Sequence, residues 1–155
     1  MEKVKLTNMC MIVDEKTNKV LVQDRTKNDW DGITFPGGKL ELGEAVVPST
    51  IREVQEETGL TVSNLQFCGI KDRYDHKKEE RYIVFLLKTC DFTGTLIEAT
   101  QEGRVFWVDI DKIKEYKLSN DFEEMLDIFQ GNGAEFFYED LRIEDEKSRW
   151  AKRQY

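Results

Sequence analysis

The sequence predicts an α/β fold of the α+β type, with helices on both sides of a curled β-sheet. Two patterns carry this prediction: several runs of apolar and β-branched residues have the length of strands, and one segment between them has apolar residues at helical spacing. Chains that mix the two kinds of element pack helices against a sheet around one core. The chain has 155 residues, 39 % of them hydrophobic, and no linker, internal repeat or low-complexity tract. We therefore expect residues 1–155 to form a single domain.

The N-terminal part of the chain begins with a predicted hairpin. Residues 3–13 (KVKLTNMCMIV) and 19–25 (KVLVQDR) are rich in apolar and β-branched residues, and the DEKTN between them is typical of a turn. The apolar residues ITF at 33–35 lie within the glycine-rich stretch NDWDGITFPGGKLELGE. This stretch predicts a brief strand that leads into a loop.

A helix is predicted over about residues 46–58, where the pattern changes to helical spacing. Pro48 suits the first turn of a helix, where its missing N–H costs little, and Gly59 suits the position just past the end. Apolar residues recur at intervals of four, three and four. One buried stripe is therefore expected at Val47, Ile51, Val54 and Thr58.

The second half of the chain predicts more strands and then two helical segments. Strands are expected at residues 60–74, 80–92 and 103–110, and the second of these is nearly continuous in apolar residues and so is placed at the centre of the sheet. Helical patterns follow at residues 109–116 and 119–130.

The tail, about residues 131–155, begins as a candidate strand around FFYED and ends as a charged stretch. An exposed apolar strand tends to pair with another chain. A homodimer formed through FFYED is therefore a hypothesis.

Composition excludes several classes of protein. A formal net charge of −8 argues against a nucleic-acid polymer as the main partner, so a small anionic ligand would need a metal cation to mediate its binding. Cys10, Cys68 and Cys90 are far apart and lack a CxxC spacing. We therefore expect neither a disulfide framework nor a zinc site, and we predict that all three are small core residues. Without a signal peptide or a long apolar run, the chain is expected to be cytoplasmic and not to engage a membrane.

Three glutamates, Glu53, Glu56 and Glu57, are concentrated near the end of the predicted helix. At about 100° per residue they occupy an arc of roughly 100° that points away from the expected buried stripe, with Arg52 at its edge. A solvated helix face is one interpretation. However, like charges at this spacing destabilise a helix by about a few tenths of a kcal/mol per pair, and the helix dipole disfavours anions in the last turn. Because clustered oxygen ligands suit Mg²⁺ or Mn²⁺, we favour a metal site that handles phosphates.

The stretch GKLELGEAVVPSTIREVQEETGL, residues 38–60, matches every fixed position of the Nudix hydrolase signature. The matching residues are Gly38, Glu44, Arg52, Glu53, Val54, Glu56, Glu57, Gly59 and Leu60. In its short length and compact FPGGKLELGE entry, the chain most resembles the MutT-type diphosphatases of this family. The resemblance implies the Nudix fold, a mixed sheet sandwiched between helices, over about residues 1–130, and it leaves the tail outside.

The resemblance also implies a metal-dependent attack of water on a phosphorus atom of a nucleoside diphosphate derivative. Arg52 and Glu44 would hold the carboxylates in place, and Glu53 would accept the proton of the water. Glu102, which precedes the segment GRVFWV, is an alternative base and a further ligand, or else a plain turn carboxylate. The ligands of Mg²⁺ or Mn²⁺ would be Glu53, Glu56, Glu57, Glu102 and the backbone carbonyl of Gly37.

By analogy with the MutT type, the substrate would be an oxidised nucleoside triphosphate such as 8-oxo-dGTP, cleaved to the monophosphate and pyrophosphate. Phe35 would line the base pocket or belong to the core, and Asn120 would read the purine edge or cap a helix. Trp30 would stack on the base or cover the core. The phosphates would contact Gly38, Arg25 and Lys39, unless the last two are merely solvated. The lone His76 receives no role.

Other substrates rank lower. ADP-ribose hydrolases of the family tend to carry a proline about fifteen residues after the signature, and this chain has no proline after Pro48. Its sequence also lacks the arginine-bearing motif of the coenzyme A hydrolases, and its acidic balance disfavours an RNA 5′ end. A dinucleoside polyphosphate stays open as a substrate. A module that binds a nucleotide without cleaving it is the alternative of another class, and such modules commonly lose signature glutamates that are all present here.

Overall fold

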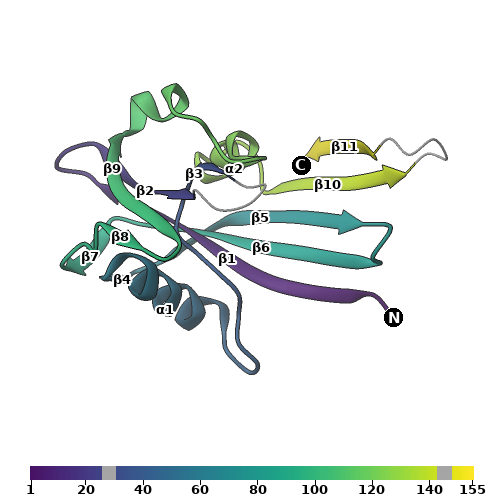
Figure 1. Cartoon of the computed structure of the whole chain (residues 1–155), viewed down its shortest axis with the longest axis horizontal. Helices are drawn as coiled ribbons and strands as arrows, with labels where there is room; N and C mark the ends of the chain where they lie inside the picture. The colour runs from purple at the N-terminus through teal and green to yellow at the C-terminus, as the bar shows by residue number, and fades with distance from the viewer. Residues whose placement is uncertain (26–30, 143–147) are drawn as a thin grey trace.

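The computed structural model describes residues 1–25, 31–142 and 148–155 (Figure 1). The elements along these ranges are, in chain order, β1 (Lys3–Asp14), β2 (Lys19–Arg25), β3 (Gly32–Thr34), α1 (Val46–Thr58), β4 (Leu60–Ser63), β5 (Gln66–Asp75), β6 (Glu80–Thr89), β7 (Asp91–Gly94), β8 (Ala99–Thr100), β9 (Gly103–Asp109), the 3-10 helix η1 (Ile110–Glu115), α2 (Phe122–Phe129), β10 (Glu135–Arg142) and β11 (Ser148–Gln154).

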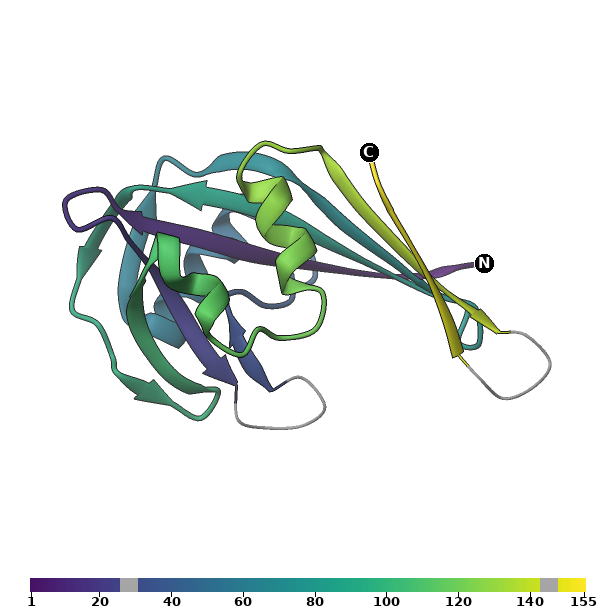
Figure 2. The same cartoon turned by 90° about the horizontal axis from the view of Figure 1, so that it is seen from above.

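The main sheet is mixed, as expected. Its strands follow the order β11-β10-β5-β6-β1-β2-β9-β8, and β3 pairs with β2. The pairs β1–β6 and β5–β10 are parallel, whereas β1–β2, β5–β6 and β10–β11 are antiparallel. β4 and β7 form a separate two-stranded sheet. Figure 2 shows the far ends of β1, β5, β6, β10 and β11 running together beyond α2, so these strands extend the sheet on one side.

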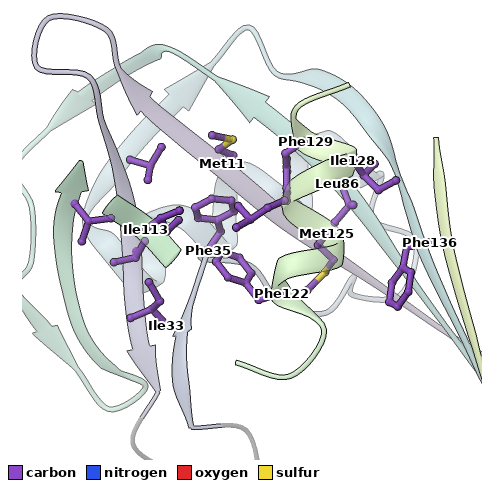
Figure 3. Close-up of a cluster of buried hydrophobic side chains, with 14 of the residues drawn as sticks. Met11, Ile33, Phe35, Leu86, Ile113, Phe122, Met125, Ile128, Phe129 and Phe136 are labelled. Atoms are coloured by element: carbon purple, nitrogen blue, oxygen red, sulfur yellow. The ribbon is translucent and has the colours of Figure 1, made fainter. Parts of the chain in front are cut away.

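Helices cover both faces of the sheet, which confirms the predicted fold class. In Figure 1, α1 lies on one side, while α2 and η1 lie on the other. Two separate clusters of buried apolar residues correspond to these two interfaces. The cluster under α2 and η1 includes Phe35, Ile113, Phe122 and Phe129 (Figure 3), and the cluster under α1 includes Val54 and Leu21. No helix in the described part of the chain has the length and apolar character needed to cross a membrane.

Several predicted elements are confirmed. The N-terminal hairpin is formed with Val13 opposite Val20. The helix α1 begins at Val46 and ends at Thr58, with Gly59 following in the left-handed conformation (φ 79°) that glycine adopts without strain. β6 lies inside the sheet between β5 and β1, where a nearly continuous apolar strand was expected.

Two predicted strands were too long. The segment 60–74 divides into β4 and β5, which belong to different sheets, because Asn64 adopts a left-handed conformation (φ 52°) that turns the chain. The segment 80–92 divides at Cys90 into β6 and β7. Cys90 is exposed at this break and Cys68 is half-buried, so of the three cysteines only Cys10 is a fully buried core residue.

The buried stripe of α1 is rotated from the predicted one. Val54 and Thr58 are fully buried, but Val47 is 43 % exposed, and Thr50 and Glu57 take buried positions instead. The helix turns this way because one edge of its glutamate face meets the loop that follows β3.

The tail adds two strands, of which only the first was anticipated. FFYED, residues 136–140, lies in β10, which pairs with β5 on one side and β11 on the other. This strand is therefore not an edge, and the reason given for a homodimer through FFYED is wrong. The outer strand is β11, whose Lys152 and Arg153 are of the kind that discourages edge pairing.

The packing of Phe35 yields a prediction. Its fully buried ring meets the rings of Phe122 and Phe129 edge-on, with centroids 4.8 and 5.2 Å apart. Phe35→Ala should lower the free energy of unfolding by about 3–5 kcal/mol, because it removes these contacts and leaves a cavity. Urea unfolding followed by circular dichroism would measure the change.

Phe67→Ala is the matched control, since Phe67 is 64 % exposed. It should change the free energy of unfolding by no more than about 0.5–1 kcal/mol. Equal losses in the two variants would contradict the placement of Phe35 in the core.

Candidate functional site

The loop that follows β3 lies against both β1 and α1, and two glycines permit this approach. A Cβ atom at Gly37 would clash with the backbone oxygen of Asn8, and one at Gly38 would clash with the carboxylate of Glu53. The N–H of Gly38 donates to Oδ1 of Asn8 (3.3 Å), whose Nδ2 donates to Oγ of Ser49 (3.0 Å). These hydrogen bonds connect β1, the loop after β3 and α1.

Arg52 connects three of the signature glutamates. Its Nε and Nη2 donate to the two carboxylate oxygens of Glu44 at 2.8 and 2.9 Å. Its Nη1 donates to Glu53 at 2.9 Å and to Glu56 at 3.2 Å, and Nη2 also reaches the carbonyl of Lys39 at 3.0 Å. The hydrogen bonds from Arg52 lower the pKa of Glu44 to about 2. One guanidinium thus offsets the repulsion within the cluster and attaches the preceding loop to α1, as expected for the pair Arg52 and Glu44.

Glu57 is the buried member of the cluster. Its Oε2 accepts a hydrogen bond from the N–H of Gly37 at 3.0 Å. Burial raises the pKa of Glu57 to about 7, and the charges of Glu53 and Glu102 add to the rise, while the Gly37 N–H and the charge of Arg25 oppose it. Ionisation of Glu57 is therefore costly unless another cation approaches.

The three carboxylates share one arc of α1, as the helical spacing predicted, but they differ in exposure. Glu56 is 58 % exposed at its side chain, Glu53 is 15 % exposed, and Glu57 is buried. The helical angles were correct, but the loop at Gly37 covers one edge of the arc. Within the cluster, exposure to solvent therefore decreases from Glu56 to Glu53 to Glu57.

Glu102 reaches the same place from a distant part of the chain. It lies in the turn between β8 and β9, next to Gly103, which has a φ of 133°. A Cβ at Gly103 would clash with the carbonyl oxygen of Asp24, so glycine allows the turn to pack against the end of β2. Glu102 is thereby brought close enough to Glu57 to raise its pKa.

These residues border a cavity of about 840 Å³. Of the residues predicted from the sequence, Arg25, Phe35, Gly37, Gly38, Lys39, Glu53, Glu57, Glu102 and Asn120 line it. Glu44, Arg52 and Glu56 do not line it and instead form the network behind Glu53. The structure therefore brings most of the predicted residues together and separates cavity-lining groups from the groups that hold them.

The proposed contacts to a base have mixed outcomes. Phe35 borders the cavity, but its ring is fully buried, so it belongs to the core. Asn120 is exposed and lines the cavity, and the residue that caps α2 is Asp121, so the capping alternative for Asn120 is wrong. Trp30 lies outside the described residues. His76 lies 3.4 Å from Glu139 and does not line the cavity.

Another wall of the cavity was not anticipated from the sequence. Lys71 and Arg73 on β5, Lys78 in the following turn, and Tyr82 on β6 line this wall. The only available signal was the alternation of Lys71 and Arg73 along a strand, which places both side chains on one face. Whether that face is solvated or lines a cavity depends on the strands and helix that pack beside it.

The donor set suits a hard divalent cation, although no three cysteine, histidine or acidic residues in the described part of the chain converge on one point. Two contacts account for this arrangement: Arg52 bonds Glu53 and Glu56, and the N–H of Gly37 holds Glu57. The site nevertheless offers carboxylate oxygens at the wall of the cavity. The carboxylate of Glu57 is buried, and a bound cation would offset the free-energy cost of its charge. The carboxylate oxygens at this site are therefore of the ligand type that a hard divalent cation prefers.

Comparison with known proteins agrees with this site. The family profile described as NUDIX domain matches residues 5–129. An uncharacterized Nudix hydrolase of Bacillus subtilis, YvcI, is 33 % identical over 135 residues, which are 83 % of this chain and 81 % of that protein. The 8-oxo-dGTP diphosphatase of Proteus vulgaris is 35 % identical over 68 % of this chain and 94 % of its own length. The ADP-ribose pyrophosphatase of Methanocaldococcus jannaschii is 28 % identical over 72 % of this chain and 66 % of its own.

The fold has close structural counterparts. The crystal structure of the MutT protein of Bacillus halodurans superposes with a TM-score of 0.75 at 22 % identity and covers 96 % of this chain and 97 % of that one. Nudix hydrolases generally use divalent metal ions, in agreement with the donor set on α1. The matched profile covers most of the chain, including the signature helix, the cavity wall and α2. The chain therefore belongs to the Nudix hydrolases and is a pyrophosphohydrolase.

Proposed function

We propose that this enzyme uses Mg²⁺ or Mn²⁺ to hydrolyse nucleoside triphosphates to the monophosphate and pyrophosphate, and that its substrates are oxidised purine nucleotides such as 8-oxo-dGTP. One observation carries the proposal. Glu53, Glu57 and Glu102, from two distant segments, gather at one cavity that Arg25 and Lys39 also line. Carboxylates beside cations suit a metal-bound chain of phosphates.

The residues that would hold the metal are Glu53, Glu56, Glu57, Glu102 and the carbonyl of Gly37. When bound there, a divalent cation would neutralise charge on the pyrophosphate and make a bound water more acidic. Arg25 and Lys39 would add positive charge on the substrate side. The Nε of Arg25 is buried and has no hydrogen-bond partner within the described ranges, so a phosphate oxygen would satisfy it.

The chain's own groups would handle the proton and the positioning. Glu53 would accept the proton of the attacking water, since it lines the cavity and Arg52 holds one of its oxygens at 2.9 Å. Glu102 is the alternative base. Arg52, fixed in turn by both oxygens of Glu44, would keep Glu53 and Glu56 in place while substrate charge enters the cavity.

Two observations support a purine nucleotide, and the name of one relative supports an oxidised one. The cavity volume of about 840 Å³ lies within the range that encloses a nucleotide-sized ligand. Asn120 lines the cavity, and its amide can both donate to and accept from a purine edge. The Proteus vulgaris relative is named for this activity.

ADP-ribose is the second candidate substrate. The name of the Methanocaldococcus jannaschii relative favours it, and the lack of a proline after Pro48 argues against it.

The proposal also includes a single domain over residues 1–155, because β10 extends the sheet through its pairing with β5.

A product assay tests the proposed reaction. Purified protein with Mg²⁺ should release pyrophosphate and 8-oxo-dGMP from 8-oxo-dGTP faster than it cleaves ordinary dNTPs, ADP-ribose or a dinucleoside polyphosphate. Glu57→Gln should lower the rate by about 100-fold or more, because the buried oxygen donor loses its charge. Chromatography of the products gives both the rates and the bond that is cleaved.

Glu53→Gln and Glu102→Gln, assayed together, identify the base, and the larger loss is expected for Glu53→Gln. Lys77→Gln serves as a control because Lys77 does not line the cavity. Faster release of AMP from ADP-ribose would refute the assigned substrate. Binding of nucleotides without any turnover would refute the enzymatic proposal in favour of a sensor.

The cost of charge on Glu57 predicts how metal affects stability. The pKa of Glu57 is about 7 in the folded chain and 4.5 ordinarily, so folding favours the protonated form. Its stabilising contribution is therefore complete below pH 4.5 and is lost as the pH rises through 7. Millimolar Mg²⁺ should raise the melting temperature above pH 7, by about 2–4 °C for each kcal/mol of binding free energy, and should raise it less as protons compete near pH 5.

Differential scanning calorimetry with and without a chelator would measure this shift. Glu56→Gln and Glu57→Gln should each reduce the shift, and Glu98→Gln, which alters a carboxylate that does not line the cavity, should leave it unchanged. An equal shift in all of these proteins would place the cation elsewhere.

A further inference from the structure

Asp121 lies at the start of α2, directly after Asn120, and its carboxylate is not used as a helix cap. It occupies the capping position of α2, but its side chain makes no capping hydrogen bond. Its backbone is left-handed, with a φ of 64°, a conformation that aspartate adopts more readily than most residues do. The side chain is only 6 % exposed, so its charge needs partners other than water.

Two lysines from different strands are those partners. The Nζ of Lys71 on β5 lies 3.5 Å from one carboxylate oxygen of Asp121, and the Nζ of Lys152 on β11 lies 3.0 Å from the other. Lys152 also donates to Oε1 of Glu124 in the first turn of α2, at 2.7 Å. It lies opposite Tyr138 of β10, a member of the cluster under α2, and so belongs to the face of the sheet that α2 covers. The outer strand is thereby connected to the start of α2.

Asn120 lies between this paired carboxylate and a second fixed point. The N–H of Ser119 donates to the carbonyl oxygen of Ile33 on β3 at 3.0 Å. A Cβ atom at Gly32 would clash with the backbone of Ser119, so the loop packs directly on β3. Asn120 itself is exposed and lines the cavity. Its direction therefore depends on its two neighbours, Ser119 held by β3 and Asp121 held by the lysines.

An ordinary surface ion pair is the simpler explanation of the contact between Lys152 and Asp121. Lys152 is 45 % exposed at its side chain, and exposed pairs contribute little to stability. However, the carboxylate that it meets is buried, and hydrogen bonds to a charge are stronger where water is excluded. The matched family profile ends at residue 129, so β11 lies beyond it. The tail thus supplies a cation to a residue that adjoins the cavity.

We propose that Lys152 is a positioning residue for base recognition, because by holding Asp121 it fixes the direction in which Asn120 presents its amide to the base. Asn120 contacts the base, and Lys152 acts only through Asp121. The inference rests on the proposed function in assigning the purine edge to Asn120. The carboxylates of the metal site lie on α1 and in the turn before β9, so they do not depend on this contact.

Binding of a purine and a pyrimidine monophosphate tests the inference without hydrolysis. In millimolar Mg²⁺, isothermal titration calorimetry should show that the wild-type protein binds dGMP more tightly than dCMP. Lys152→Gln should lower this ratio of affinities by about 3–10-fold, which is the factor that one hydrogen bond supplies. Lys152→Arg keeps the charge and should restore most of the ratio.

Arg153→Gln is the matched control. Arg153 is the next residue on β11, so it lies on the opposite face of the sheet, where it pairs with Glu139 at 3.5 Å. Its variant should keep the wild-type ratio. Asp121→Asn removes the charge but keeps a side chain that tolerates the left-handed backbone, and it should lower the ratio as Lys152→Gln does. The double variant of Asp121 and Lys152 should lower the ratio no further, since both changes break one contact.

Steady-state kinetics separate positioning of the base from damage to the metal site. Lys152→Gln should raise KM for 8-oxo-dGTP more than it lowers kcat, because the interaction with the base is lost and the metal-binding carboxylates are unchanged. A fall in kcat with an unchanged KM would contradict a role in positioning the base.

Equal affinity of the wild-type protein for dGMP and dCMP, no binding of either, or a ratio that survives Lys152→Gln would overturn the inference. Lys152 is half-exposed, so its variants are expected to fold. Cleavage of 8-oxo-dGTP by the wild-type protein is measured separately. A protein that cleaves it and keeps its ratio in Lys152→Gln refutes the inference alone. A protein whose ratio falls in that variant but which cleaves no triphosphate refutes only the proposed function.

Discussion

The hydrogen bond from the backbone N–H of Gly37 to the buried carboxylate of Glu57 joins the two segments on which the rest of the site depends. It can form only because neither Gly37 nor Gly38 carries a side chain, so the loop reaches β1 on one side and Glu53 of α1 on the other. This contact rotates the buried stripe of α1 away from Val47 and toward Glu57. The carboxyl group of Glu57 is thereby held where its charged form is poorly solvated.

Placing that charge costs free energy, and the surroundings offset only part of the cost. Arg52 binds Glu44, Glu53 and Glu56, whereas Glu57 is held by the backbone N–H of Gly37. The charged form of Glu57 is therefore not fully compensated by positive charge in the described structure. The cavity beside it is also lined by Lys71, Arg73 and Lys78. A divalent cation bound at the carboxylates would supply the missing positive charge.

Local patterns explain how much of this could be predicted from the sequence. The signature residues and α1 follow from short-range spacing, and Gly59 and Pro48 mark the ends of that helix. The turn at Glu102 could be connected to the site only through family resemblance, because it lies far from α1 in the sequence and comes near Glu57 only in the folded chain.

The remaining features were beyond sequence reasoning for a similar reason. The inward position of Glu57 depends on a loop that folds back from another segment. The position of Lys71 and Arg73 at the cavity depends on the register of β5 against β6 and β10, which a single strand does not reveal. The left-handed conformation of Asn64 divides the predicted strand at residues 60–74 into β4 and β5. Asparagine tolerates this conformation, and the alternation of apolar residues does not indicate where it occurs.

The central claim is that burial makes Glu57 titrate near neutral pH until a cation binds, and carbon NMR of its side-chain carboxyl tests this most directly. In chelator, the titration should give a pKa of about 7 for Glu57, and millimolar Mg²⁺ should move that pKa well below its ordinary value of 4.5. A pKa near 4.5 in chelator that Mg²⁺ leaves unchanged would contradict the account, because the buried carboxylate would then need no cation.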